Sequence, residues 1–150
     1  MRESLGEAKE ELKRADHLIY VSLKYTRSVD VIRSTIERLI NTYEIIVKSV
    51  LVRAKERKLI ASIPMSPGIQ AEIVRDLYSD DETITNYIQF YLLLRRMYKG
   101  KYTRAREFRR NVTMTVEVDK KQVEVNIDII TEYYKRSLAF LDYVRDKFLK

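Results

Sequence analysis

The spacing of apolar residues between positions 29 and 54 limits the fold more than any other feature of this sequence. These residues recur every three or four positions, the period that keeps side chains on one face of an α-helix. The stripe consists of Val29, Ile32, Ile36, Leu39, Tyr43, Ile46, Val50 and Ala54. Further apolar residues flank it: Ile40, Val47 and Leu51. The sequence therefore predicts a long helix that is buried on more than one side and is the central element of a helical bundle.

A second stripe, over residues 5–22, predicts an amphipathic helix that begins in a capping box at Ser4–Glu7. Its phase does not continue into the stripe that starts at Val29. Either the chain turns near residues 25–28, with Ser28 capping the next helix, or one long helix carries a stutter. We favour the turn. The residues expected to widen the apolar face of the first helix are Leu18, Val21 and Tyr25.

Caps and apolar spacing predict three further helices. Ser66 and Pro67 begin the first of them, at the end of a connecting loop that is rich in proline and glycine. Asp81 caps the next helix, Gly100 ends it, and Asp128 caps the last. Their apolar faces comprise Ile69, Ile73 and Leu77; then Ile84, Tyr87, Ile88, Tyr91, Leu94 and Tyr98; then Ile130, Tyr134, Ser137, Leu141, Val144 and Phe148.

The apolar period changes after Asn111. Apolar and polar residues alternate over residues 112–118 and again over 123–127, which is typical of a β-hairpin with one buried face. The predicted fold class is therefore mainly α: an antiparallel bundle of four to six helices with one β-hairpin, at about residues 112–127, inserted before the C-terminal helix. Residues 1–150 are expected to form a single helical-bundle domain.

A short basic segment, residues 95–110, holds the whole excess of positive charge. It contains eight of the 29 lysine and arginine residues and one of the 22 acidic residues, so the rest of the chain is neutral although the net charge is +7. Its basic residues are Arg95, Arg96, Lys99, Lys101, Arg104, Arg106, Arg109 and Arg110. Charge gathered in one block predicts a surface for an anionic partner.

Aromatic residues interleave with these cations. Tyr98 and Tyr102 are candidates to stack on the bases of single-stranded RNA. The spacing of Tyr102, Ala105 and Phe108 predicts a short helix with these side chains on its inner face.

The alternative interpretation of the basic segment is a solvated surface whose charges pair with acids elsewhere in the fold. The acids considered for this role are Glu10, Glu11, Asp80 and Asp81. Against it, Glu107 is the one acid inside the segment and leaves most of the local repulsion unrelieved.

Several functional classes lack the residues that they need. The chain has no cysteine, and its one histidine, His17, is expected at the surface or its boundary. No phosphate-binding glycine motif or zinc-protease motif occurs, and Asp80–Glu82 is interpreted as the acidic start of a helix. We therefore predict no catalytic residue, metal site or cofactor.

The composition and the first residues bear on location. The N-terminus is charged and the apolar runs are short, so neither a signal peptide nor a membrane span is expected, and a cytoplasmic protein is predicted. Few glycines and many charged residues are typical of heat-adapted, archaeal-like proteins.

The run from Arg110 to Thr115 resembles the HEPN signature, in which an arginine and a polar residue are followed a few positions later by a histidine. HEPN domains are small all-α bundles; many are RNA-cleaving toxins or partners of minimal nucleotidyltransferases, and their arginine and histidine act on an RNA phosphate across a dimer. The resemblance implies that Arg110 contacts phosphate, that Asn111 is its polar neighbour and that the chain forms a homodimer. Thr115 stands where the histidine is expected, and a hydroxyl does not replace imidazole as a general acid–base near neutral pH.

Three functions follow from these features. The favoured one is a non-catalytic, HEPN-like domain that binds RNA or another polyanion through residues 95–110. The second is a dimeric interaction module that docks an acidic protein partner, such as a nucleotidyltransferase or antitoxin subunit. The third is a residual ribonuclease that uses Arg110 with tyrosine or threonine hydroxyls.

Overall fold

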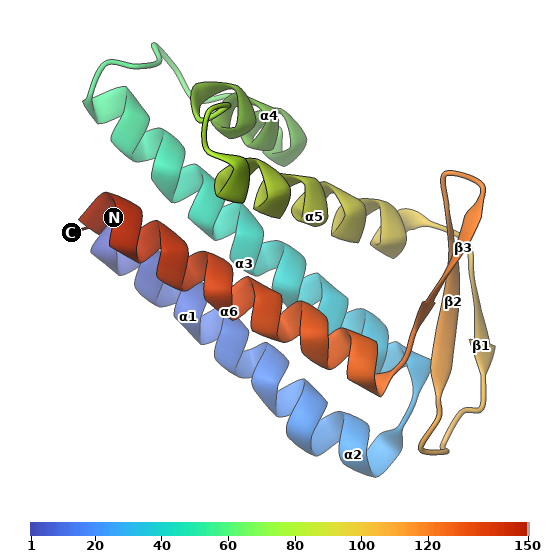
Figure 1. The fold of residues 1–150 in the computed structure, drawn as a ribbon. Helices are drawn as coiled ribbons and strands as arrows, with labels where there is room; N and C mark the ends of the chain where they lie inside the picture. The colour runs from blue at the N-terminus through green and yellow to red at the C-terminus, as the bar shows by residue number, and fades with distance from the viewer. Residues whose placement is uncertain (150) are drawn as a thin grey trace.

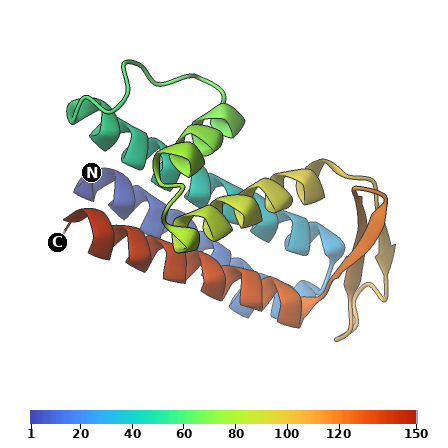
Figure 2. The same ribbon diagram turned by 45° about the horizontal axis from the view of Figure 1, so that its top comes forward.

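The computed structural model describes residues 1–149, and most of them are helical (Figure 1). Helix α1 (Arg2–His17) packs antiparallel to α3 (Val29–Glu56) and α6 (Ile127–Leu149). Helix α5 (Glu82–Lys99) lies along α3, and the shorter α4 (Pro67–Leu77) crosses over both, as Figure 2 shows. A small antiparallel sheet closes one end of the bundle, and both termini lie at the other end. The predicted fold class is confirmed.

Helix α3 is the central element, as its apolar stripe predicts. Every residue of that stripe is buried, and the flanking residues are buried as well. The ring of Tyr43 stacks on Tyr91 of α5 at 5.8 Å and on Phe140 of α6 at 5.1 Å between centroids. Ser137 donates a hydrogen bond to the Tyr43 hydroxyl (3.3 Å), so this tyrosine joins three helices. No helix within residues 1–149 combines the length and the apolar character that crossing a bilayer requires.

The junction between α1 and α3 turns where the phase of the stripes changes. The left-handed backbone of Arg27 (φ 51°) ends the short helix α2 (Leu23–Thr26). Ser28 then caps α3, because its hydroxyl accepts a hydrogen bond from the Val31 amide (3.2 Å). The predicted turn is confirmed.

A π-helical turn, η1 (Leu18–Ser22), joins α1 to α2. Such a turn holds one more residue than an α-helical turn and rotates the following side chains about the helix axis. Val21 and Tyr25 are consequently 41% and 80% exposed. The prediction that they widen the buried face is wrong.

The helix caps agree with the sequence in part. Asp81 caps α5 as predicted, since its carboxylate accepts a hydrogen bond from the Ile84 amide (3.1 Å). The capping box at Ser4 is wrong, because α1 already begins at Arg2. Asp128 does not cap α6: Asn126 accepts the bond from the Ile129 amide (2.8 Å).

Helix α4 begins at Ser66 and Pro67 as predicted, but its buried face is displaced by one residue. Ile69 is 51% exposed whereas Gln70 is buried. The Gln70 side-chain amide donates to the Pro64 carbonyl (2.7 Å), which satisfies a polar group of the connecting loop and turns this position inward.

The sheet has three strands in the order β1 (Tyr102–Ala105), β2 (Thr113–Val118) and β3 (Lys121–Val125), all antiparallel. Strands β2 and β3 form the predicted hairpin. Its turn is tighter than expected, because Asp119 and Lys120 both adopt left-handed backbone angles (φ 52° and 66°), as two-residue hairpin turns require. The short helix predicted from Tyr102, Ala105 and Phe108 is wrong, because pairing with β2 draws this stretch into a strand.

Gly100 joins α5 to β1 at a point of close approach. A β-carbon on Gly100 would lie 2.5 Å from the Glu117 carbonyl oxygen and 2.8 Å from a methyl carbon of Val116. Its φ of −73° is ordinary, so the expected left-handed helix stop is wrong. Glycine is needed here because β2 packs against the end of α5.

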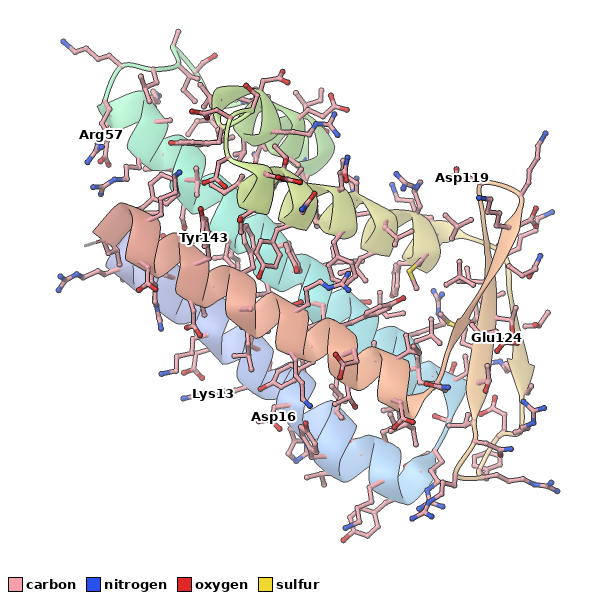
Figure 3. All side chains as sticks on the ribbon, in the orientation of Figure 1. Lys13, Asp16, Arg57, Asp119, Glu124 and Tyr143 are labelled. Carbon is pink, nitrogen blue, oxygen red and sulfur yellow. The ribbon has the colours of Figure 1, made fainter. Side chains whose placement is uncertain are left out.

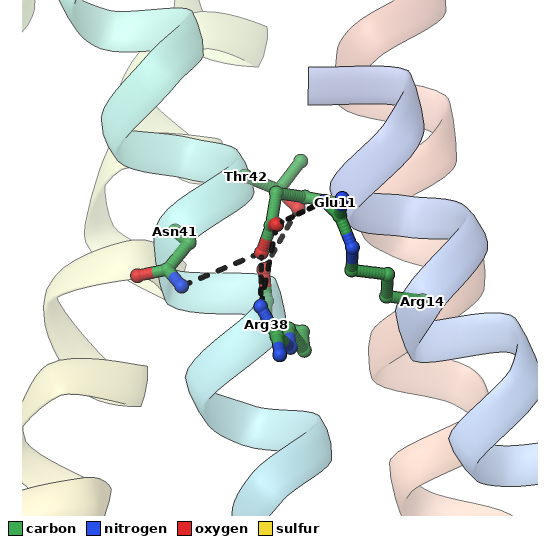
Figure 4. Close-up of polar contacts among 5 residues, drawn as sticks. All are labelled: Glu11, Arg14, Arg38, Asn41 and Thr42. Atoms are coloured by element: carbon green, nitrogen blue, oxygen red, sulfur yellow. Dashed lines mark hydrogen bonds and ion pairs between the residues drawn. The ribbon is translucent and has the colours of Figure 1, made fainter. Parts of the chain in front are cut away.

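A buried carboxylate joins α1 to α3 (Figure 4). Glu11 points from α1 toward α3, where Arg38 and Asn41 each donate to it at 3.4 Å. Arg14, one turn further along α1, donates at 2.6 Å. These contacts satisfy a charge that burial would otherwise make unfavourable.

Candidate functional site

The basic segment spans three pieces of structure at the sheet end of the bundle. Arg95, Arg96 and Lys99 lie on the last turns of α5. Lys101 and Arg104 lie before and within β1. The remaining basic residues, Arg106, Arg109 and Arg110, lie with Asn111 in the β1–β2 loop, residues 106–112. All eight basic side chains are exposed except that of Arg95, which is half-buried.

The outer face of the sheet is not part of a basic surface. Tyr102 pairs with Val116 and Arg104 with Met114, so Tyr102 and Arg104 share the face that the buried β2 side chains turn toward the helices. The opposite face carries polar and acidic residues: Thr103, Ala105, Thr115, Glu117, Gln122 and Glu124. The segment therefore offers cations on both sides of β1 rather than one continuous stripe across the sheet.

Arg104 has a structural role within this arrangement. Its guanidinium pairs with Asp30 at 2.8 Å and with Glu107 at 3.2 Å. Hydrogen bonds to Asp30 and then Glu107 raise the pKa of Arg104. This arginine fastens β1 to the first turn of α3.

The β1–β2 loop is clamped to the start of α3 by the one acid of the segment. The Glu107 carboxylate accepts a hydrogen bond from the Val29 amide (3.1 Å), an amide that has no partner within its own helix. The Phe108 amide donates to the Arg27 carbonyl (2.9 Å). Arg106 and Phe108 both hold left-handed backbone angles (φ 55° and 65°), which these contacts sustain.

Tyr98 and Tyr102 share one cation. The guanidinium carbon of Arg33 lies 4.4 Å from the ring centre of Tyr98 and 4.3 Å from that of Tyr102. The Tyr98 hydroxyl donates to Glu37, and this bond, together with burial, raises the pKa of Tyr98. One face of each ring is thus occupied, and base stacking by these tyrosines stays a prediction.

Two other aromatic side chains are far more exposed. Phe108 is 73% exposed and Tyr25 is 80% exposed. They belong to the same corner of the molecule, since the Phe108 amide bonds the carbonyl of Arg27, two residues beyond Tyr25. Sequence reasoning missed both, although the change of phase after residue 22 was a signal that Tyr25 leaves the buried face.

The acids proposed to neutralise the basic segment pair elsewhere. Glu10 pairs with Lys13, Glu11 with Arg14 and Arg38, and Asp81 with Lys147. Within the basic segment, Arg96 pairs with Asp119 at 3.6 Å, across the hairpin turn labelled in Figure 3, and Arg104 pairs as described.

Most of the segment's charge is therefore unpaired in the part of the chain that the structure describes. The residues without an ion pair there are Arg95, Lys99, Lys101, Arg106, Arg109 and Arg110. The alternative interpretation as a surface neutralised by Glu10, Glu11, Asp80 and Asp81 is wrong in its partners.

A cavity of about 590 Å³ opens where α2, the β1–β2 loop and the start of α6 meet. Its lining includes Arg110 and Asn111, as well as Lys24 and Arg27 from the other side. The sequence offered no signal for this meeting, because more than 80 positions separate Arg27 from Arg110. A second cavity, of about 500 Å³ between α4, α5 and α6, is lined by Arg75, Arg96 and Arg136.

The residues considered for catalysis do not gather at either cavity. Thr115 lies on the outer face of the sheet and His17 is exposed at the end of α1. Neither lines the cavity that contains Arg110. No cluster of three or more histidine or acidic side chains suited to a metal ion occurs among residues 1–149.

Comparisons of the chain with protein-family models, with curated proteins and with solved structures found no match. What the chain binds is therefore inferred from its own residues: unpaired cations, exposed aromatic rings and a cation-lined cavity, all at the sheet end of the bundle.

Proposed function

We propose that the chain is a HEPN-like helical domain that binds RNA, or another polyanion, through residues 95–110 and does not cleave it. The observation that carries the proposal is the unpaired charge of this segment within residues 1–149. Like charges held together without carboxylates repel one another, and a polyanion relieves that repulsion. The phosphates of RNA are spaced along a flexible strand that can follow cations on separate elements.

The exposed aromatic rings favour single-stranded RNA over a compact anion. Phe108 lies next to Arg109 in the loop, and Tyr25 lies between Lys24 and Arg27. An aromatic ring beside cations offers a stacking surface for an unpaired base together with a contact for its phosphate. These two rings join Tyr98 and Tyr102 as candidates for base stacking.

Binding without cleavage fits the placement of the hydroxyl and imidazole groups. Thr115 and Arg110 lie on different surfaces, so the hydroxyl is not placed to exchange a proton at a phosphate held by Arg110. His17 lies outside the cavity as well. The arrangement supports a contact residue rather than an acid–base pair.

The test is the affinity of single-stranded RNA for the double variant Arg109→Glu/Arg110→Glu, measured by fluorescence anisotropy. Both side chains are exposed and unpaired within the described residues, so the variant is expected to fold. Reversing two phosphate contacts should weaken binding by about tenfold or more at moderate salt and reduce the salt dependence by about one unit per contact.

The matched control is Lys55→Glu/Arg57→Glu, which makes the same change of charge at the end of α3. Figure 3 shows Arg57 at the end of the bundle remote from the sheet. If the two double variants lose affinity equally, only net charge matters and the proposed site is refuted. If RNA does not bind the native protein at all, the cations serve another purpose, and docking of an acidic protein by a homodimer becomes the leading function.

A further inference from the structure

We infer that the cavity lined by Arg110 binds a terminal phosphate together with its nucleoside, as found at a phosphorylated RNA end or in a free mononucleotide. This inference rests on the proposed function and names the group that this one corner selects. The cavity adds Lys24 and Arg27, outside the basic segment, to Arg110 within it.

The charges of the lining match a phosphate monoester. Lys24, Arg27 and Arg110 line the cavity, and none of them makes an ion pair within residues 1–149. Asp128 is the one acid among the lining residues, so the cavity carries two positive charges in excess. A phosphate monoester carries about −1.5 to −2 near neutral pH, because its second pKa is about 6. An internal phosphodiester carries only a single negative charge and would leave one cation uncompensated.

The other lining residues suit a nucleoside. Tyr20 is half-exposed, and its ring packs edge-on against Tyr134 with centroids 6.4 Å apart, so its orientation is held while it borders the cavity. An aromatic face of this kind stacks on a base. The Asp128 carboxylate is an acceptor for the hydroxyls of a ribose, and carboxylates fill this role in other nucleotide sites.

Two amide side chains complete the polar lining. Asn126 uses its oxygen to accept the Ile129 amide, which leaves its amino group as a donor beside the cavity. Asn111 uses its main-chain carbonyl to accept from Thr113 (2.8 Å), which leaves its side chain for a ligand. Such a set of polar groups around one aromatic ring is typical of small-molecule sites, and about 590 Å³ lies within their usual range of roughly 300–1,000 Å³.

The experiment compares competitors that displace a labelled single-stranded RNA from the native protein. One short RNA sequence is prepared with a 5′-phosphate, with a 3′-phosphate and without a terminal phosphate, and a free nucleoside monophosphate is titrated alone by calorimetry. At least one phosphorylated form should compete about tenfold better than the unphosphorylated form, as expected for one added charge-assisted hydrogen bond. The arm that competes best distinguishes an RNA end from a free nucleotide.

The variant Arg110→Gln should bring the ratio between phosphorylated and unphosphorylated RNA close to one. The matched control Lys101→Gln removes an equal charge from an exposed residue outside the cavity and should keep the ratio while weakening both forms alike. Equal competition by all RNA forms with the native protein overturns the inference and leaves the proposed function standing.

If the labelled RNA does not bind at all, the proposed function fails, and the calorimetric titration decides the inference alone. Saturable binding of the nucleoside monophosphate that Arg110→Gln removes supports the cavity as its site. Absence of heat with the native protein overturns it.

Discussion

The substitution Gly100→Ala tests how the sheet is seated on the bundle, and through it how the basic segment is positioned. The added β-carbon would lie 2.5 Å from a carbonyl oxygen of β2 and 2.8 Å from a methyl carbon of Val116. Relaxed carbon contacts lie at about 3.5–4.0 Å, so the end of α5 and strand β2 must separate. Overpacking of this kind costs about 1–3 kcal/mol of unfolding free energy. The expected fall in Tm is about 2–4 °C per kcal/mol for a chain of this size.

The measurement is urea denaturation followed by circular dichroism, with Gly6→Ala as the matched control. Gly6 lies inside α1 with no atom within 4 Å of an added β-carbon, so alanine there should stabilise the protein by about 0.5–1 kcal/mol. Opposite signs for the two substitutions are the predicted result. An unchanged midpoint and slope for Gly100→Ala would show that α5 and β2 are not in close contact, which refutes the account of this junction.

Two further changes probe the contacts that hold the site in place. Asp81→Ala removes the cap of α5 and the acceptor of bonds from Tyr143 (2.7 Å) and Lys147 (2.6 Å), so the unfolding free energy at pH 7 should fall by about 1–2 kcal/mol. Burial by itself would raise the pKa of Asp81, but the bonds from Lys147, Tyr143 and the Ile84 amide lower it. The carboxylate therefore stabilises the fold above the unfolded pKa of about 3.9, and the difference from Asp81→Ala should shrink in urea titrations as the pH falls below about 4. Glu107→Ala releases the loop from α3, and amide exchange at Val29 should accelerate by at least about fivefold for each kcal/mol lost, as NMR can measure; unchanged exchange would mean that Glu107 is not a clamp.

The parts of the fold that follow from local sequence were predictable. The stripe on α3, the caps at Ser28 and Asp81, and the alternation in β2 and β3 each depend on neighbours a few positions away. Strand β1 was not, because its residues are drawn into a strand only by pairing with β2, after a loop whose left-handed residues are not glycines. Tyr102, Ala105 and Phe108 fit a helical period equally well, and tertiary pairing decides between the two.

The candidate site was predictable only in its local half. Counting charges locates residues 95–110, but no local pattern places Lys24 and Arg27 beside Arg110 or Arg33 over Tyr98. The stutter between the first two stripes was the nearest signal. It marks the π turn and the left-handed Arg27, which together turn this corner toward the β1–β2 loop.

The measurement that tests the central claim most directly is the affinity of fluorescent single-stranded RNA for the native protein at several salt concentrations. Phosphate contacts to single strands contribute about 0.7 each to the salt dependence, so several unpaired cations predict a log–log slope of about −3 to −5. The same samples, run on a gel, should show intact RNA. No saturable binding at low salt, or a slope near zero, would contradict the claim that the basic segment binds RNA, and cleaved RNA would contradict the claim that it does so without catalysis.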